Sequence, residues 1–136
     1  MEKDCCKFHF TSETERVRNI VKYLLEFVDE HAPAKEVRDD LRLVFSELLY
    51  NAVIHGNKGD ANKSVHVKVK AEEDRIFAII QDEGLGFDYQ ETIDQAGTEA
   101  SLLNGNGRGI ILVNALTDKL SFNKRGNEIR FEKKLK

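Results

Sequence analysis

The most informative stretch of this 136-residue chain is Phe45-Ser46-Glu47-Leu48-Leu49-Tyr50-Asn51-Ala52-Val53-Ile54-His55-Gly56. Its apolar residues recur at helical spacing, and Glu47 and Asn51 stand four positions apart, so both side chains fall on one face of the expected helix. Polar groups that border an apolar stripe cost free energy unless they are hydrogen-bonded or bind a ligand. From these residues alone, both a core hydrogen-bond network and a ligand site remain open.

Two later segments supply groups that suit a nucleotide. Asp82-Glu83-Gly84-Leu85-Gly86-Phe87 follows an apolar strand and places an acceptor beside backbone that a planar group can approach closely. Gly105-Asn106-Gly107-Arg108-Gly109-Ile110 precedes a helix, whose free N–H groups and positive dipole end favour a phosphate. A tight turn would explain the first segment alone and a flexible connector the second, but the three segments in combination predict a nucleotide site.

The spacing of the glycines matches neither common phosphate motif. It is G-x-G-x-G rather than the dinucleotide pattern G-x-G-x-x-G, and the Gly-Lys-Ser/Thr of a P-loop is missing. Asn51 offers a neutral oxygen that suits Mg²⁺ when phosphates and waters fill the remaining positions. Glu47, one turn earlier, could orient or deprotonate a hydroxyl that attacks a terminal phosphate. His55, one turn beyond Asn51, is predicted to have a core or capping role.

Hydrophobic periodicity predicts an α+β fold, a two-layer sandwich in which a mixed, mainly antiparallel sheet carries helices on one face. The segment 88–104 lacks a strong period and is predicted to be a mobile lid. We expect one domain over residues 1–136. The predicted elements are a strand at 7–10, a helix from about 11 that stops before Pro33, a helix over 35–56, strands at 65–70 and 75–81, a helix that starts in the glycine cluster, and a hairpin of 119–123 with 128–135.

Composition narrows the classes of partner. The chain has 21 basic and 24 acidic residues, and the basic residues are scattered, so no extended nucleic-acid face is indicated. No apolar run approaches the span of about 20 residues that a membrane helix needs, so we expect a cytoplasmic protein. Cys5 and Cys6 are adjacent and no other cysteine exists, which excludes a disulfide scaffold. Together with His9 they fall short of a closed zinc site.

The three segments, taken in order, resemble the N, G1 and G2 boxes of the Bergerat ATP-binding fold. That superfamily includes gyrase, a heat-shock chaperone, histidine kinases and MutL, and the resemblance covers nearly the whole chain. Within it, the short length, residues 51–58 and the Gly107-Arg108-Gly109-Ile110 form are similar to the anti-sigma factor serine/threonine kinases of bacterial partner-switching systems. Ile54 departs from the histidine kinases, which usually carry a basic residue there.

This resemblance implies ATP and Mg²⁺ as cofactors and gives each motif residue a role. Asn51 would hold Mg²⁺, Glu47 would be the general base and Asp82 would bind adenine. The glycines of the second segment would shape the adenine pocket and those of the third would cradle phosphates, namely Gly84 and Gly86, then Gly105, Gly107 and Gly109. Arg108 would either neutralise phosphate charge or be solvated.

The resemblance also implies a reaction and partners. The reaction is transfer of the ATP γ-phosphate to a serine or threonine of an anti-anti-sigma protein, with a sigma factor as the competing partner and a homodimer as the acting form. No direct contact with nucleic acid or membrane is expected. Two alternatives remain open: an ATP-binding module that sequesters a partner without phosphoryl transfer, and a detached histidine-kinase catalytic domain.

Overall fold

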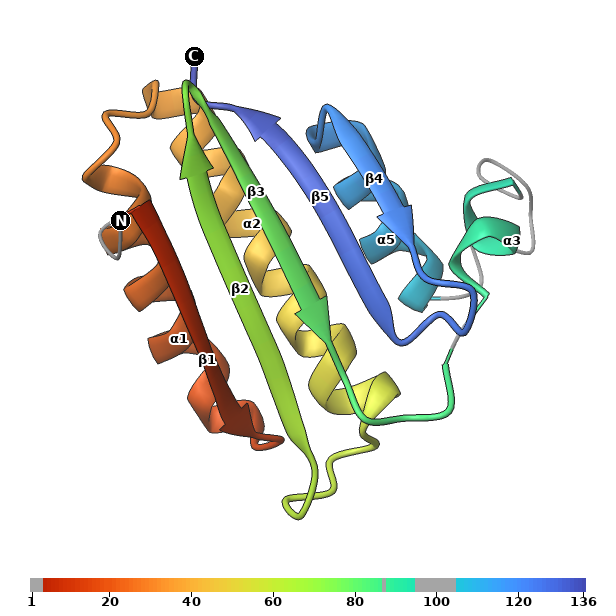
Figure 1. Cartoon of the computed structure of the whole chain (residues 1–136). Coiled ribbons are helices and arrows are strands. Elements are labelled where there is room, and N and C mark those ends of the chain that lie inside the picture. The colour runs from red at the N-terminus through yellow and green to blue at the C-terminus, as the bar shows by residue number, and fades with distance from the viewer. Residues whose placement is uncertain (1–3, 87, 95–104) are drawn as a thin grey trace.

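An antiparallel sheet forms one layer of the structure, a computed structural model that describes residues 4–86, 88–94 and 105–136. Its five strands lie in the order β1-β2-β3-β5-β4 (Figure 1). Every pairing between these strands is antiparallel, so the predicted α+β class with a mainly antiparallel sheet is confirmed. The strands are β1 (Cys5–Thr11), β2 (Ser64–Glu72), β3 (Arg75–Gln81), β4 (Lys119–Phe122) and β5 (Glu128–Lys134).

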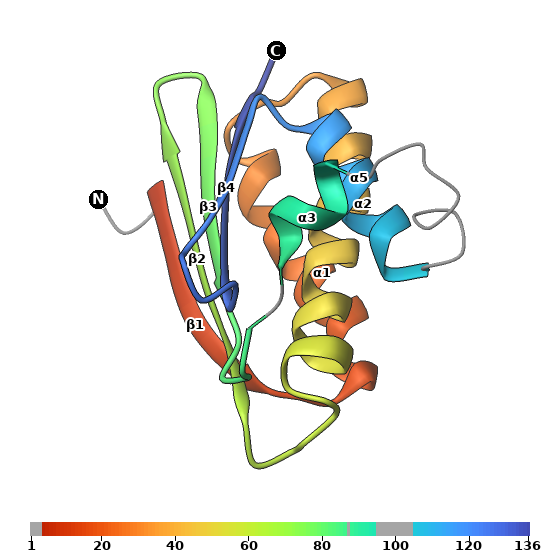
Figure 2. The ribbon, with the colours of Figure 1, turned by 90° about the vertical axis from the view of Figure 1, so that its right-hand side faces the viewer.

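The helices form the second layer and cover one face of this sheet, as Figure 2 shows edge-on. The long helix α2 (Lys35–Tyr50) lies centrally and packs against α1 (Thr14–Asp29) on one flank and α5 (Gly105–Leu116) on the other. A short helix, α3 (Tyr89–Asp94), packs against α5. None of the helices that the structure describes combines the length and apolarity that a membrane crossing requires.

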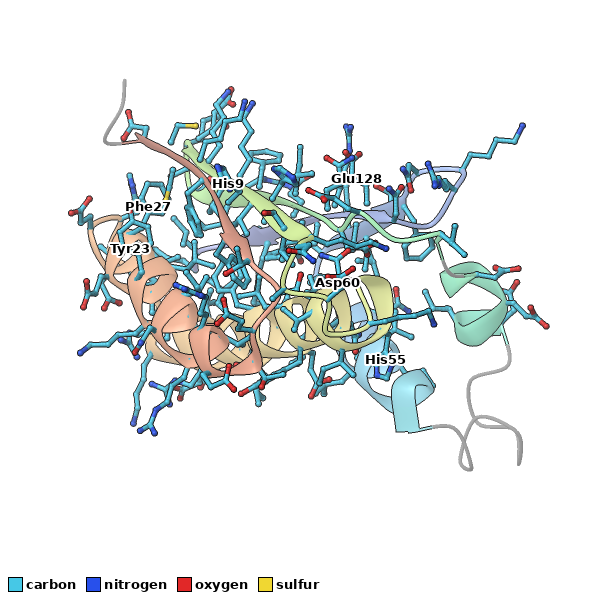
Figure 3. The ribbon with its side chains drawn as sticks, turned by 90° about the horizontal axis from the view of Figure 1, so that it is seen from below. His9, Tyr23, Phe27, His55, Asp60 and Glu128 are labelled. Atoms are coloured by element: carbon cyan, nitrogen blue, oxygen red, sulfur yellow. The ribbon has the colours of Figure 1, made fainter. Side chains whose placement is uncertain are left out.

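The core lies between the two layers. Along β2 the odd-numbered valines are buried, whereas His66, Lys68 and Lys70 are exposed on the outer face of the sheet, as period-two alternation predicts. Figure 3 shows His9 and Glu128 on that outer side and His55 on the helical side. His55 is exposed, so of the predicted core or capping role the core alternative is wrong and the capping alternative stays a prediction.

Two elements differ from the sequence-based predictions. The predicted helix 35–56 changes type at Asn51, where α2 gives way to a π-helical turn, η2 (Asn51–Gly56). The Asn57 N–H donates to the Ala52 carbonyl at 2.8 Å, which is the i to i−5 bond of a π-helix. The helix α3 lies inside the segment predicted to lack regular structure, and residues 95–104 of the predicted lid lie outside the described residues.

Candidate nucleotide-binding site

Glu47 and Asn51 meet the N-terminal part of α5. A Cβ on Gly109 would clash with Glu47 Oε2 and would lie 3.8 Å from Asn51 Nδ2, so any larger residue there would displace the Glu47 carboxylate. The packing of α5 on α2 therefore brings the first and third predicted segments together. Gly109 is the fifth residue of α5, so the Glu47 carboxylate lies beside the second turn of a helix whose first turn carries free N–H groups and a partial positive charge.

The side chain of Asn51 has no hydrogen-bond partner in the described part of the protein. Its residue is 8% exposed, and in the described part of the chain the side chains of Asn51 and Glu47 make no hydrogen bond. The core hydrogen-bond network that the sequence left open is therefore not formed. Among the described residues only His31 Nε2 is a fully buried side-chain polar atom without a partner, so the Asn51 carboxamide and the half-buried Glu47 carboxylate remain accessible to a ligand.

Asp82 follows the last residue of β3 and is 5% exposed. Its Oδ1 accepts the Gly84 N–H at 2.7 Å, which leaves further acceptor capacity on the carboxylate. Burial raises the pKa of the Asp82 carboxyl, while the Gly84 hydrogen bond and the charges of Arg125 and Lys63 act in the opposite direction. Asp82 therefore combines the burial and the free acceptor that recognition of a planar amine requires.

The segment that contains Asp82 lies against the end of η2. A Cβ on Gly84 would clash with the Gly56 carbonyl oxygen, and the Asp82 carboxyl group contacts the Gly56 backbone. Since η2 runs from Asn51 to Gly56, it is at most about 9 Å long at the rise of an α-helix. Gly86 lies instead against the β4–β5 turn, at a φ of 103°. All three predicted segments therefore converge along α2 and η2.

Part of the third segment is described only by its backbone. Gly105 and Gly107 fall in the first turn of α5, the place expected for a phosphate cradle. The side chain of Arg108 lies outside the described residues. The roles of these residues stay predictions.

Comparison with known proteins agrees with this arrangement. Residues 10–133 match the histidine kinase-like ATPase domain family. The chain belongs to this family. The ATPase domain is 26% identical over 133 residues to the anti-sigma F factor of Bacillus subtilis (strain 168), which covers 95% of this chain and 90% of that protein.

Two further relatives carry the same name. The anti-sigma F factor of Lysinibacillus sphaericus is 25% identical over 127 residues, 90% of this chain and 86% of that protein. The anti-sigma F factor of Bacillus thuringiensis (strain Al Hakam) is 30% identical over 95 residues, 69% of this chain and 65% of that protein. The predicted resemblance to the Bergerat fold and the anti-sigma factor kinases is thereby confirmed.

An ATPase domain implies ATP binding, and the residues present fit that ligand. The side chains of Asn51 and Glu47 make no hydrogen bond in the described residues and lie near the N-terminal part of α5, where phosphates bind favourably. The buried acceptor Asp82 lies at the other end of η2. The site therefore has polar groups for phosphates at one end and an acceptor for a planar base at the other, as a nucleotide requires.

Sequence reasoning missed Asn57, which joins several segments of this ATPase domain. It is fully buried, and its Nδ2 donates to Ser12 Oγ at 2.7 Å and to the Ser64 carbonyl at 2.9 Å. Its Oδ1 accepts the Glu83 N–H at 2.7 Å. Asn57 therefore fixes the loop beside Asp82 to the end of η2. An asparagine after a helix-terminating glycine is typical of a turn, so nothing local indicated this role.

The β4–β5 turn also supports the site and was predicted only as a turn. The Asp82 N–H donates to the Asn127 carbonyl at 2.9 Å, and Asn127 Nδ2 donates to the Asp82 carbonyl at 3.2 Å. Asn123 Oδ1 in turn accepts the backbone N–H groups of Gly126, Asn127 and Glu128. The turn therefore holds the backbone of Asp82, while the Asp82 carboxyl group lies against Gly56.

Proposed function

We propose that this chain is an ATP-binding anti-sigma factor with serine/threonine kinase activity. It transfers the γ-phosphate of ATP to an anti-anti-sigma protein and exchanges that protein for a sigma factor. The observation that carries the proposal is the pair Glu47 and Asn51, which lie without hydrogen-bond partners against Gly109 at the start of α5. The anti-sigma F factors similar to this chain support the regulatory part.

In this proposal each polar residue has one task. Asn51 holds Mg²⁺ through its amide oxygen, and the bound metal neutralises charge on the phosphates. Glu47 accepts the proton of the attacking serine or threonine hydroxyl, which makes that oxygen a better nucleophile. The Glu47 carboxylate has no competing hydrogen bond in the described residues, so it is free to act as an acceptor.

The remaining residues position the nucleotide. Asp82 accepts the exocyclic amine of adenine, with Gly84 and Gly86 giving the base room to approach. The backbone N–H groups at Gly105, Gly107 and Gly109 face the phosphates, and Arg108 adds positive charge beside them. In this proposal residues 1–136 form one ATP-binding domain that acts as a homodimer.

The first test is calorimetric titration of the protein with ATP, with and without Mg²⁺, repeated on Asn51→Ala. We expect saturable, Mg²⁺-dependent binding that the substitution weakens by at least about tenfold. Absence of ATP binding by the wild-type protein would overturn the proposal.

The second test separates the kinase from its two alternatives. The protein is incubated with Mg²⁺, ATP labelled at the γ-phosphate and a candidate anti-anti-sigma protein, and phosphoamino acids of the target are analysed. Acid-stable phosphate on serine or threonine is the expected result. A stable complex without phosphate would identify a sequestering module, and acid-labile phosphate would identify a histidine-kinase catalytic domain.

A further inference from the structure

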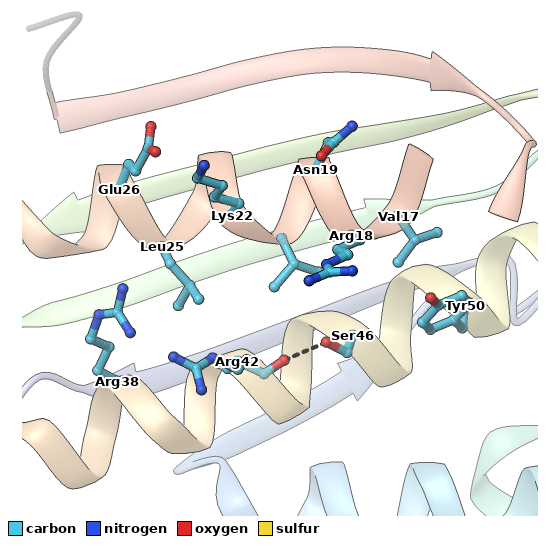
Figure 4. Close-up of a pocket in the computed structure, with 11 residues that line it drawn as sticks. Val17, Arg18, Asn19, Lys22, Leu25, Glu26, Arg38, Arg42, Ser46 and Tyr50 are labelled. Carbon is cyan, nitrogen blue, oxygen red and sulfur yellow. Dashed lines mark hydrogen bonds between the residues drawn. The ribbon is translucent and has the colours of Figure 1, made fainter. Parts of the chain in front are cut away.

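A groove opens to solvent between α1 and α2, on the flank of α2 opposite α5 (Figure 4). The apolar side chains of Val17, Val21 and Leu25, each 7% exposed or less, form its floor. Figure 4 shows Arg18 reaching from α1 toward α2, and Arg42 reaching from α2 into the same space. We call this feature the α1–α2 groove.

The lining of the α1–α2 groove carries four basic side chains and one carboxylate, that of Glu26, so it is basic overall. Arg18, Lys22 and Arg42 are exposed and take part in no ion pair among the described residues. Arg38 lies at one end and forms a bidentate pair with Asp29. The whole chain carries a net charge of −3, so this concentration of positive charge does not follow from its composition.

An apolar stripe borders the basic side chains. Tyr50 lines the groove and is 39% exposed, and Leu43 and Ile54, 47% and 44% exposed, lie on the same helical stripe. Single exposed apolar residues are ordinary on a protein surface. A stripe of them beside unpaired cations matches a partner surface that is itself amphipathic, with carboxylates on one side and apolar side chains on the other.

The length of the groove indicates a polypeptide occupant. On α2 the lining runs from Arg38 to Tyr50, a distance of roughly 18 Å at helical rise. That span exceeds a single phosphate and equals about three turns of a helix. A nucleic acid strand is disfavoured because the apolar floor of the groove offers a phosphate backbone no partner, whereas it can bury the apolar side chains of a peptide.

We propose that the α1–α2 groove docks an acidic, amphipathic segment of a partner protein. Carboxylates of that segment pair with Arg18, Lys22 and Arg42, and its apolar side chains cover the groove floor and Tyr50. This docking proposal rests on the proposed function in one respect, which is that the chain acts by binding another protein. It places that partner and the nucleotide on opposite flanks of α2, since Ser46 and Tyr50 line the groove while Glu47 and Asn51 face α5.

The test is fluorescence anisotropy with a labelled synthetic helix of about 16 residues that carries Glu on one face and Leu on the other. The matched probe has Lys in place of every Glu. We expect the Glu probe to bind the wild-type protein, and the double variant Arg18→Glu/Arg42→Glu to bind it at least about tenfold more weakly. The Lys probe should gain affinity for the double variant by a similar factor.

A control variant reverses one charge elsewhere. Lys68 is exposed on β2, on the outer face of the sheet, and Lys68→Glu should leave binding of the Glu probe unchanged. Circular dichroism and urea titration establish that the variants are folded, and Arg42→Ala replaces the double variant if it does not fold. Added salt should weaken binding of the Glu probe, because exposed charges are screened.

Three outcomes would overturn the proposal: equal binding of the Glu probe to wild type and double variant, an equal loss in Lys68→Glu, or equally tight binding of single-stranded DNA or inorganic phosphate. The last result would identify a general anion site. Since the assay contains no nucleotide, its failure would leave the phosphoryl-transfer proposal untouched, and failure of ATP binding would leave this result standing.

Discussion

Asn51 and Asn57 flank the same π-helical turn, yet their surroundings are opposite. Asn57 is fully buried and makes three side-chain hydrogen bonds, to Ser12, Ser64 and Glu83. Asn51 is 8% exposed and makes none within the described residues. The same residue type is therefore a scaffold element at one end of η2 and an open ligand position at the other. The number of side-chain hydrogen bonds distinguishes these two roles, whereas the exposed fraction, which is low for both residues, does not.

The largest expected effect is on the rate of phosphoryl transfer, at Glu47 beside Asn51. Glu47→Gln should lower the rate of phosphoryl transfer about 10³-fold, because an amide cannot accept the hydroxyl proton. Its free energy of unfolding should change by less than about 1 kcal/mol, since no hydrogen bond of Glu47 is lost. Single-turnover transfer of labelled phosphate and urea unfolding measure the two quantities. Full turnover by the variant would show that another group is the general base.

The next largest effect is on the free energy of unfolding, at Asn57. Asn57→Ala should lower the free energy of unfolding by about 3 kcal/mol, because the Glu83 N–H and the Ser64 carbonyl lose their partner. Urea titration followed by circular dichroism measures this loss. The matched control is Asn62→Ala, an exposed position in the following loop, which should change stability by less than about 0.5 kcal/mol. Similar losses in both variants would remove the special role of Asn57.

A smaller effect on stability is expected at the open end of η2. Asn51→Ala should change the free energy of unfolding by less than about 1 kcal/mol while it weakens Mg²⁺-dependent ATP binding. Urea titration and calorimetry on the same preparation compare the two. A loss of stability as large as that of Asn57→Ala would show that both asparagines stabilise the fold to the same extent.

The smallest effect is a pH dependence at Asp82. Burial raises the pKa of this carboxyl above that of an unfolded aspartate, so the folded state binds the proton more tightly than the unfolded state. The stability that this provides is complete below the pKa of the unfolded state and is lost as the pH rises through the folded-state pKa. Asp82→Asn keeps an acceptor for the Gly84 N–H, and its stability relative to wild type should rise over this pH range. Urea midpoints that move in parallel with pH for both proteins would contradict the expectation.

The sequence predicted the features that depend on local spacing. Alternation along residues 65–70 predicted a strand, helical periodicity along residues 35–56 predicted a helix, and Glu47 with Asn51 came from their four-residue separation. Asn57 could not be found in this way, because its partners Ser12 and Glu83 lie far away in the sequence. The same holds for the hydrogen bonds of Asn127 with Asp82.

Two further features had no sequence signal. The change from α2 to η2 shifts backbone hydrogen bonds by one residue without altering the apolar pattern, so periodicity cannot detect it. The α1–α2 groove joins Arg18 and Arg42, which belong to separate helices and appear as ordinary scattered charges along the chain. Both features depend on how elements pack against one another.

The π-helical turn has a consequence for the alignment of related sequences. Because η2 accommodates one more residue per turn than an α-helix would, the number of residues between Asn51 and Gly56 sets which backbone atoms meet Asp82. A one-residue gap placed in this interval would rotate Gly56 away from the Asp82 carboxyl group. Insertions and deletions between the two motifs should therefore be absent from relatives that keep this contact, even though Ile54 and His55 are exposed.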